Sequence, residues 1–226
     1  MKKQILTIIT SLLLFTSANA IEFPNMKFGI GLSGGMAQVK ASGSETESAN
    51  TGAEASTRDA SVDAMSAIGS IFAEVILDNG ITFGAEIVPM SADVSDATHS
   101  RSETMIAASG EGATGTNTRT ADAEVENFTT IYTEIPVGAM YVKAGLSQID
   151  INTLETNLSN GGAYKNDTVD GYTLGVGIKG EWAGFYTKLA LERTDFDDYV
   201  APSGTTNTIT ADLDVNQVKF SIGKAF

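Results

Sequence analysis

The stretch Tyr172–Glu192 reads YTLGVGIKGEWAGFYTKLALE, and its pattern decides the fold class. In its first half, apolar side chains occupy every second position, with small or charged residues between them. Successive side chains of a strand point to opposite faces, so a period of two predicts a β-strand with one apolar face. After Ala183-Gly184 the alternation starts again at Phe185, which predicts a second strand joined to the first by a tight turn. The apolar members are Tyr172, Leu174, Val176, Ile178, Trp182, Phe185, Leu189 and Leu191.

The same period of two extends outward from this hairpin to most of the chain. Ile149 and Ile151 are out of phase with the apolar residues before them, so we expect a slip of the alternation before Ile149. The total is about eight strands, each near the ~9–11 residues that a tilted membrane strand needs. The six further alternating stretches are residues 27–36, 70–77, 81–88, 128–135, 140–151 and 218–226.

The connections between these stretches alternate in length. Three are short, and four are long and rich in Ser, Thr, Ala, Gly and acidic residues. Short turns at one end and long loops at the other are typical of an outer-membrane barrel. The pattern therefore predicts an all-β, eight-stranded antiparallel up-and-down transmembrane β-barrel with short periplasmic turns and long extracellular loops. The short connections are 78–80, 136–138 and 183–184, and the long ones are 41–64, 95–124, 152–168 and 195–212.

The composition excludes several classes of function. The 226 residues include 14 Lys and Arg against 28 Asp and Glu, a formal net charge of −14. Phosphate backbones are bound by clustered basic side chains, so nucleic acid is excluded as a partner. The chain contains no Cys, which excludes disulfides, thiolate metal sites and a Cys nucleophile.

The N-terminal segment has the pattern of a secretory signal peptide. Two lysines precede an uncharged, mainly apolar run from Ile5 to Phe15, and Ala18 and Ala20 form a small-x-small cleavage pattern. We therefore expect a signal peptide at residues 1–20, cleaved after Ala20, and a barrel domain at residues 21–226. An exported chain with these strands is expected in the cell outer membrane.

Alternation alone leaves open which face lines the barrel. A lipocalin-like barrel turns its apolar face inward around a ligand, whereas a membrane barrel turns it toward lipid. We favour the second arrangement because the polar face is rich in small residues and carries charges of both signs, which can fill a narrow interior in pairs. The charges expected inside are Lys27, Glu74, Glu86, Lys143, Lys179, Glu181, Lys188, Glu192 and Lys219.

Aromatic residues on the apolar faces gather at the predicted short-turn end. Amphipathic rings favour the boundary between lipid and water, so their position predicts an aromatic girdle at that end of the barrel. The expected members are Phe28, Phe83, Trp182 and Phe185, together with the terminal Phe226.

The chain ends in VKFSIGKAF, with apolar residues at alternate positions and a terminal Phe226. Together with the leader and the alternating strands, this ending resembles the small OmpA/OmpX-type, or opacity-type, outer-membrane barrels of Gram-negative bacteria. The resemblance implies a C-terminal insertion signal, read by the barrel-assembly machinery, at Val218, Phe220, Ile222 and Phe226. Lys224 departs from that signal, because an apolar or aromatic residue is usual at its position.

The expected function is structural and interactive: the barrel stabilises the cell envelope and displays acidic loops. Expected partners are outer-membrane lipid and lipopolysaccharide, the assembly machinery, and host, phage or cell-surface ligands at the loops. Neither catalysis nor a cofactor is expected. Two rival functions are a narrow porin-like channel for small solutes and a lipid A-modifying outer-membrane enzyme.

Two polar groups in the long connections are candidates for chemistry. His99 lies beside Ser100 with acids nearby, but a nucleophile and base pair needs a rigidly held base, so we expect a solvated loop histidine. Five acids around the last connection offer the oxygen ligands that Ca²⁺ prefers, yet they match no EF-hand spacing, and no metal site is expected. These acids are Asp195, Asp197, Asp198, Asp212 and Asp214.

Overall fold

The computed structural model describes residues 25–47, 56–89, 91–93, 99–106, 113–156, 164–202 and 208–226. Among these residues, no helix has the length and apolar character needed to cross a membrane. The expected signal peptide lies outside the described residues. The strands are β1 (Met26–Glu47), β2 (Ser56–Leu77), β3 (Thr82–Val88), β4 (Ala92–Asp93), β5 (His99–Ile106), β6 (Ala113–Val137), β7 (Met140–Thr156), β8 (Asp167–Trp182), β9 (Phe185–Phe196), β10 (Tyr199–Pro202) and β11 (Thr208–Ala225).

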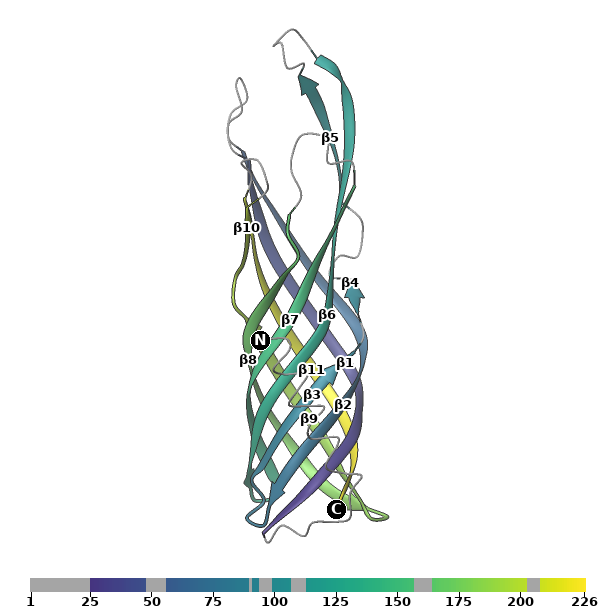
Figure 1. The fold of residues 1–226 in the computed structure, drawn as a ribbon, viewed down its shortest axis with the longest axis vertical. Coiled ribbons are helices and arrows are strands. Elements are labelled where there is room, and N and C mark those ends of the chain that lie inside the picture. Colours follow the sequence, from purple (N-terminus) through teal and green to yellow (C-terminus); the bar gives the residue numbers. More distant parts are fainter. Residues whose placement is uncertain are drawn as a thin grey trace.

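Eight strand positions form one closed wall (Figure 1). Neighbouring strands pair antiparallel in the order β1-β2-β3-β6-β7-β8-β9-β11, and β1 also pairs with β11, so the sheet closes on itself. β4 and β5 continue the position of β3 along β6, and β10 runs beside the upper part of β11. The predicted eight-stranded antiparallel up-and-down barrel is confirmed.

The register of the wall determines the tilt of its strands. Each residue of a strand has a paired residue on the next strand. Following these pairs once around the barrel leads from Lys40 of β1 back to Ile30 of the same strand, ten residues nearer the tight turns. With about 3.3 Å per residue and about 4.8 Å between strands, eight strands with this offset tilt by about 40° from the barrel axis. The interior of such a barrel is just wide enough to be filled by side chains. The intermediate partners are Asp214, Asp195, Tyr172, Leu146, Ile131, Ala85 and Ala73.

The three tight turns lie together at one end of the barrel, as the sequence predicts (Figure 1). Gly80 and Gly138 have φ values of 84° and 65°, a region that glycine enters without steric cost. Ala183 and Gly184 both have positive φ, 52° and 82°. Positive φ at both central residues is the type I′ geometry, whose twist matches the strands of a hairpin.

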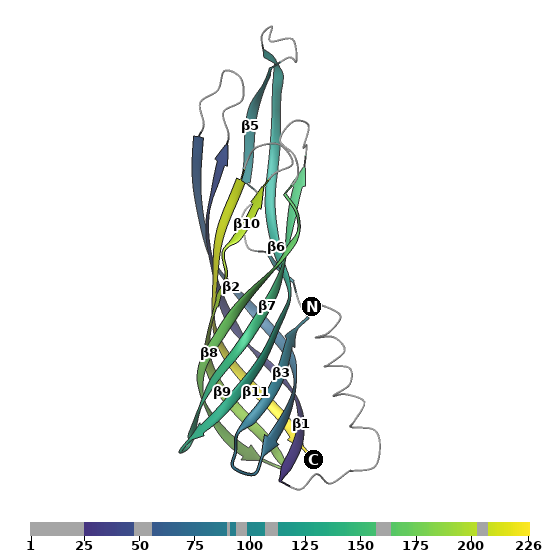
Figure 2. The same ribbon diagram turned by 60° about the vertical axis from the view of Figure 1, so that its left-hand side comes forward.

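The four long connections lie at the opposite end, but the strands run well into them. β1 extends to Glu47 and β2 begins at Ser56, so both enter the stretch 41–64 that was expected to be a loop. β5 and β6 likewise occupy much of 95–124. Figure 2 shows these extensions as separate arms above the cylinder. The Ser, Thr and Ala residues that suggested loops here pair through their backbones, which needs no apolar side chain.

Side chains keep the same alternation along each strand, yet the apolar face changes sides part-way up the barrel. Near the tight turns most inward residues are polar, such as Lys188 and Glu192 of β9, with Phe72 and Ala190 among the exceptions. Further along the same strand the inward residue is Phe196, which is buried. We call the part with a polar interior the lower section and the part beyond it the upper section. The last polar inward residues of the lower section are Thr130, Ser147, Thr173, Thr194 and Gln217.

Ile149 and Ile151 belong to the upper section, and the predicted slip before Ile149 is wrong. β7 pairs with β8 in unbroken register as far as Ile151, and Ile149 is only 3% exposed. The irregularity lies instead in β6, between Glu126 and Thr129, where Asn127 has a φ of 55°. The apparent change of phase in the sequence is the point at which the interior becomes apolar.

Candidate functional site

The lower section contains two layers of buried ion pairs. In the layer nearer the tight turns, Lys188 of β9 bridges Glu74 of β2 and Glu134 of β6. The Nζ atom of Lys188 lies 2.8 Å from Oε1 of Glu134. Lys179 of β8 reaches the other oxygen of Glu134, with 2.6 Å between Nζ and Oε2. Strands far apart in the sequence thus supply one charge-balanced cluster.

Glu74 is the most enclosed carboxylate of this layer, with an exposed fraction of 0%. The hydroxyls of Tyr132 and Tyr186 donate to its two oxygens at 2.7 and 3.0 Å. Taking a carboxylate out of water costs several kcal/mol unless it is both paired and hydrogen-bonded. Lys188 and the two tyrosines meet both conditions for Glu74.

The second layer is a ring of two lysines and two glutamates. Lys143 Nζ lies 3.2 Å from Glu86 and 2.9 Å from Glu192. Lys219 Nζ lies 2.7 Å from Glu86 and 2.8 Å from Glu192, so each lysine bridges both carboxylates. The hydroxyl of Ser70 also donates to Glu86 at 2.6 Å. All four charged side chains are buried, and their formal charges cancel.

A chain of hydroxyl groups follows the ion pairs toward the upper section. The oxygens of Thr130 and Ser147 are 3.0 Å apart, those of Ser147 and Thr173 are 2.6 Å apart, and those of Thr173 and Thr194 are 2.6 Å apart. The next inward residues are apolar and form a buried core. Its members are Ala37, Val39, Val125, Ile149, Ile151, Val169, Phe196, Tyr199, Ala201, Leu213 and Val215.

The burial of these layers means that the barrel interior is packed. A continuous water column would expose the ammonium and carboxylate groups that it passes. Instead, the side chains of Lys143, Lys188 and Lys219 are at most 5% exposed. A packed charge network beneath an apolar core is suited to sealing a barrel.

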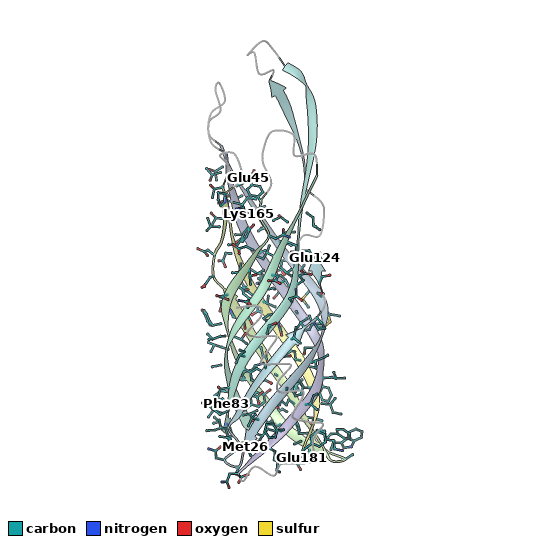
Figure 3. The ribbon with its side chains drawn as sticks, in the orientation of Figure 1. Met26, Glu45, Phe83, Glu124, Lys165 and Glu181 are labelled. Atoms are coloured by element: carbon teal, nitrogen blue, oxygen red, sulfur yellow. The ribbon has the colours of Figure 1, made fainter. Side chains whose placement is uncertain are left out.

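The interior charges expected from the sequence fall into two groups. Lys27 and Glu181 are exposed, which corrects their assignment to the interior. Both lie on the inward-facing alternation but near the tight-turn ends of their strands, and Figure 3 shows Glu181 at that end. Water at the mouth of the barrel solvates such a charge without a partner. The structure brings together the other seven, with Lys179 a third exposed and the rest buried: Glu74, Glu86, Lys143, Lys179, Lys188, Glu192 and Lys219.

Sequence reasoning missed Glu134 and the tyrosines that complete the lower layer. Glu134 and Tyr132 alternate with Ile131 and Ile135 in β6, which is a signal for the inward face. Threonines occupy both faces of this strand and reduce the contrast between them. The pairing of Glu134 with Lys188 also joins β6 to β9, a contact across the interior that no local pattern reveals.

The outside of the lower section is apolar and has aromatic residues at its tight-turn end. Of the expected girdle, Phe83, Trp182 and Phe185 are exposed and Phe28 is partly exposed, and Figure 3 shows Phe83 near that end. Further exposed apolar residues around the wall include Leu32, Ile71, Ile131, Val142, Leu174, Val176, Leu189 and Leu191.

The C-terminal residues lie on the same outer face. Val218 and Phe220 are about half exposed, Ile222 is partly exposed and Phe226 is exposed. Lys224 shares their alternation, and its Nζ lies 5.5 Å from the centroid of the Phe226 ring. A cation over an aromatic ring is a favourable contact, which makes a lysine tolerable at this position.

Many outward residues become polar where the interior becomes apolar, although Met65, Leu154 and Val200 are exposed there. Gln38 donates to Asp63 at 2.8 Å, and Gln148 donates to Asp170 at 2.7 Å. Arg193 pairs with Asp195 and Asp214, two of the five acids around the last connection. Asp197, Asp198 and Asp212 are exposed. Within the described ranges, no three acidic or histidine side chains are grouped as metal ligands.

His99 lies in a strand rather than in the loop that the sequence suggested. It begins β5, and its Cα is paired with that of Ala121 in β6. The side chain of His99 lies outside the described residues.

No protein-family model matches the chain, and no curated protein matches it by sequence. Solved structures are similar in shape at low identity. The outer-membrane protein OprG from Pseudomonas aeruginosa is 13% identical, with a TM-score of 0.48 over 88% of this chain and 96% of OprG. The outer-membrane protease OmpT from Escherichia coli is 8% identical, with a TM-score of 0.44 over 92% and 99% of the two chains. The attachment invasion locus protein Ail of Yersinia pestis is 10% identical, with a TM-score of 0.38 over 86% and 99%.

Proposed function

We propose that this chain is an integral outer-membrane barrel with a structural and surface-interaction role, neither catalytic nor conducting. The apolar exterior of the lower section supports membrane insertion, because hydrocarbon solvates such a surface and water does not. Closure of the wall through the β1–β11 pairing supports it too, because a bilayer offers no hydrogen bonds to an open sheet edge.

The proposal includes export and assembly. The leader at residues 1–20 would be removed after Ala20, and the barrel-assembly machinery would read the alternate apolar residues that end at Phe226. N-terminal sequencing of protein from isolated outer membranes tests the first step, and a mature chain that begins at Ile21 is expected.

The upper section would be the part that meets lipopolysaccharide and external ligands. Its outward Gln and Asp residues border the apolar exterior, at the level where lipid headgroups begin. Its paired strands extend above that boundary as arms, whose tips lie farthest from the barrel (Figure 2). Host, phage or cell-surface molecules are the partners that such tips would contact.

The observation that supports a sealed barrel is the burial of both ion layers. Protein purified in detergent and added to a planar bilayer is expected to give no reproducible channel openings. The control is the mobility of unboiled and boiled samples on a gel, because a closed barrel migrates differently until it is boiled. Reproducible openings by a heat-modifiable sample would favour the pore instead.

The catalytic rival rests on His99, the single histidine of the chain. Mass spectra of lipid A from cells that make the protein or its His99→Ala variant test this rival. Identical spectra are expected. A lipid A modification that depends on His99 would contradict the proposed role.

A further inference from the structure

A groove of about 720 Å³ runs obliquely across the outer face of the barrel wall. Its floor is the backbone of residues whose side chains point into the barrel, and its two sides are rows of outward side chains. Both rows follow the pairing register from β1 through β11 and β9 to β8, and the lower row continues to β7. The floor residues are Gln217, Glu192, Gly175 and Lys143, the lower row is Met36, Val218, Leu191, Val176 and Val142, and the upper row is Gln38, Asn216, Arg193 and Leu174.

This outer groove descends as it crosses the wall. At its β1 end, Met36 lies ten residues above Met26, where β1 begins, whereas at its β7 end Val142 lies only two residues beyond Met140, the first residue of β7. Four strand intervals of about 4.8 Å give a length of about 19 Å, and a strand tilt of about 40° turns this length into a descent of about 12 Å. That descent is close to the depth of one leaflet, which is half of the hydrocarbon thickness of about 30 Å.

The two ends of the outer groove differ in polarity. At the higher end the upper row consists of Gln38, Asn216 and Arg193, and it becomes apolar at Leu174 of β8. The lower row is apolar throughout. The groove therefore matches an amphipathic molecule that has its polar group at the β1 and β9 end and its hydrocarbon chain toward Val142.

Charged side chains of both signs border the higher end. The side chain of Arg193 is 52% exposed, and its guanidinium pairs with Asp195 and Asp214, whose side chains also remain accessible. Lys40, an exposed residue of β1, is paired in register with Asp63 and Asp214. A guanidinium has five N–H donors, so an exposed one can hold these carboxylates and still donate to a phosphate oxygen. The two cations and three carboxylates carry a net formal charge of −1, which suits a headgroup with charges of both signs.

We infer that the outer groove binds a lipid of the outer leaflet whose headgroup joins a phosphate to a primary ammonium group. The phosphate contacts Arg193, the ammonium donates to Asp195 and Asp214, and an acyl chain lies along the apolar part of the groove. A lipid with a phosphate alone would bring like charge to the two carboxylates, and a quaternary ammonium has no N–H to donate. This inference rests on the membrane placement proposed above.

Quenching by brominated lipids measures the headgroup preference at the groove. Trp182 is the only Trp, so Trp182→Phe gives a background without Trp fluorescence. Val176→Trp in that background places a reporter in the groove, and Val142→Trp is a second reporter if the first does not fold. Phe83→Trp, on the exterior of β3, is the reporter outside the groove. Each protein is reconstituted in phosphatidylcholine vesicles that contain a small, equal fraction of one brominated lipid: phosphatidylethanolamine, phosphatidylcholine or phosphatidylglycerol.

We expect brominated phosphatidylethanolamine to quench the groove reporter about two- to fivefold more effectively than either of the other lipids. This is the gain in affinity that an exposed charge pair provides. At Phe83→Trp the three lipids should quench equally, because Phe83 lies away from the groove.

Substitutions separate the contributions of the two parts of the headgroup. Arg193→Gln should remove the preference, whereas Lys224→Gln, at an exposed cation near the tight turns, should leave it unchanged. Asp195→Asn combined with Asp214→Asn removes two negative charges, so the preference should pass to phosphatidylglycerol. The gel mobility of unboiled samples shows that each variant is folded.

Equal quenching of the groove reporter by the three lipids would overturn the inference. A preference for phosphatidylglycerol without the Asp substitutions would overturn it too, because the groove would then select an anionic lipid. The same holds if Phe83→Trp shows the same preference as the groove reporter. Failure of the membrane placement gives a different result, in which no brominated lipid quenches either reporter.

Discussion

The lower and upper sections of the barrel are built from the same strands but are opposite in polarity. In β9, Lys188 and Glu192 face inward while Leu189 and Leu191 face outward. Further along the same strand Phe196 is inside, and Asp195, outside, pairs with Arg193. β11 makes the same change between Lys219 and Leu213, both of which point inward.

On the membrane placement proposed above, the surrounding medium, and not the backbone, decides which face of a strand is apolar. In hydrocarbon, an outward Leu is solvated by lipid and the polar residues must satisfy each other inside. In water, an outward Asp is hydrated and burial of apolar side chains supplies the stability. On the same placement, the lower section is a membrane-type β-barrel and the upper section a water-type one, so substitutions in the two sections should lower the free energy of unfolding by different amounts.

The largest decrease in the free energy of unfolding is expected for Lys188→Ala in the lower section. The change leaves Glu74 without its lysine in a site with no water, and breaking a buried pair costs roughly 3–5 kcal/mol. Urea unfolding in lipid vesicles measures this loss, and Lys224→Ala on the outer face is the control. Lys188→Met combined with Glu74→Gln should recover part of the stability, because the unpaired charge is then gone. Equal stability of Lys188→Ala and wild type would mean that the network is hydrated.

A smaller decrease in the free energy of unfolding is expected for Ile149→Ala in the upper section. Truncating a buried isoleucine removes apolar contacts and leaves a cavity, at a cost of about 2–5 kcal/mol in a water-type core. Hydrogen exchange should show the extra opening in the upper strands, while the gel mobility of the unboiled barrel stays unchanged. If hydrogen exchange rises equally in both sections, the two sections unfold as one unit. That result would contradict the division of the barrel into a lower and an upper section.

Substitutions on the outer face of β7 test where the boundary between hydrocarbon and water lies. Val142→Arg places a charge in hydrocarbon and should cost about 2–4 kcal/mol near the bilayer midplane. Gln148→Arg should have little cost, because Asp170, the present partner of Gln148, can accept from arginine as well. Unfolding in vesicles compares the two variants. A similar loss of unfolding free energy in both variants would mean that the boundary between hydrocarbon and water does not lie between Val142 and Gln148.

The smallest effect is expected for Gln38→Ala, which removes a hydrogen bond to Asp63 on the outer face of the upper section. Water can replace the amide there, so the free energy of unfolding should change by no more than about 0.5 kcal/mol. The same urea titration measures it. A loss as large as that of Ile149→Ala would mean that this face is not exposed to water.

Much of the lower section could be predicted from the sequence, because the two faces of its strands differ strongly in polarity. The hairpin of β8 and β9 sets Gly and Lys against Leu and Val, so both strands and the inward position of Lys188 followed from a period of two. β6 offers little contrast, since threonine stands on both of its faces, and Glu134 was missed for that reason.

The same alternation does not predict the upper section, because the apolar face of the strands turns inward there. The alternation predicts a slip before Ile149 because it turns every apolar residue toward lipid, whereas Ile149 and Ile151 point inward and are buried. Pairs between distant strands, such as Tyr164 with Glu45 at 2.8 Å, have no local signal either. A periodicity shows that two faces differ, but it does not show what each face touches.

The span of the ion layers along the chain has a consequence for assembly. Glu86 of β3 receives Lys219 from β11, 133 residues later, so this carboxylate stays without that lysine until the final strand arrives. A sheet of the first seven strand positions would hold Glu86 and Glu192 with Lys143 alone, which leaves one buried negative charge in excess. Partially assembled intermediates are therefore disfavoured, and closure of the last seam should make insertion cooperative.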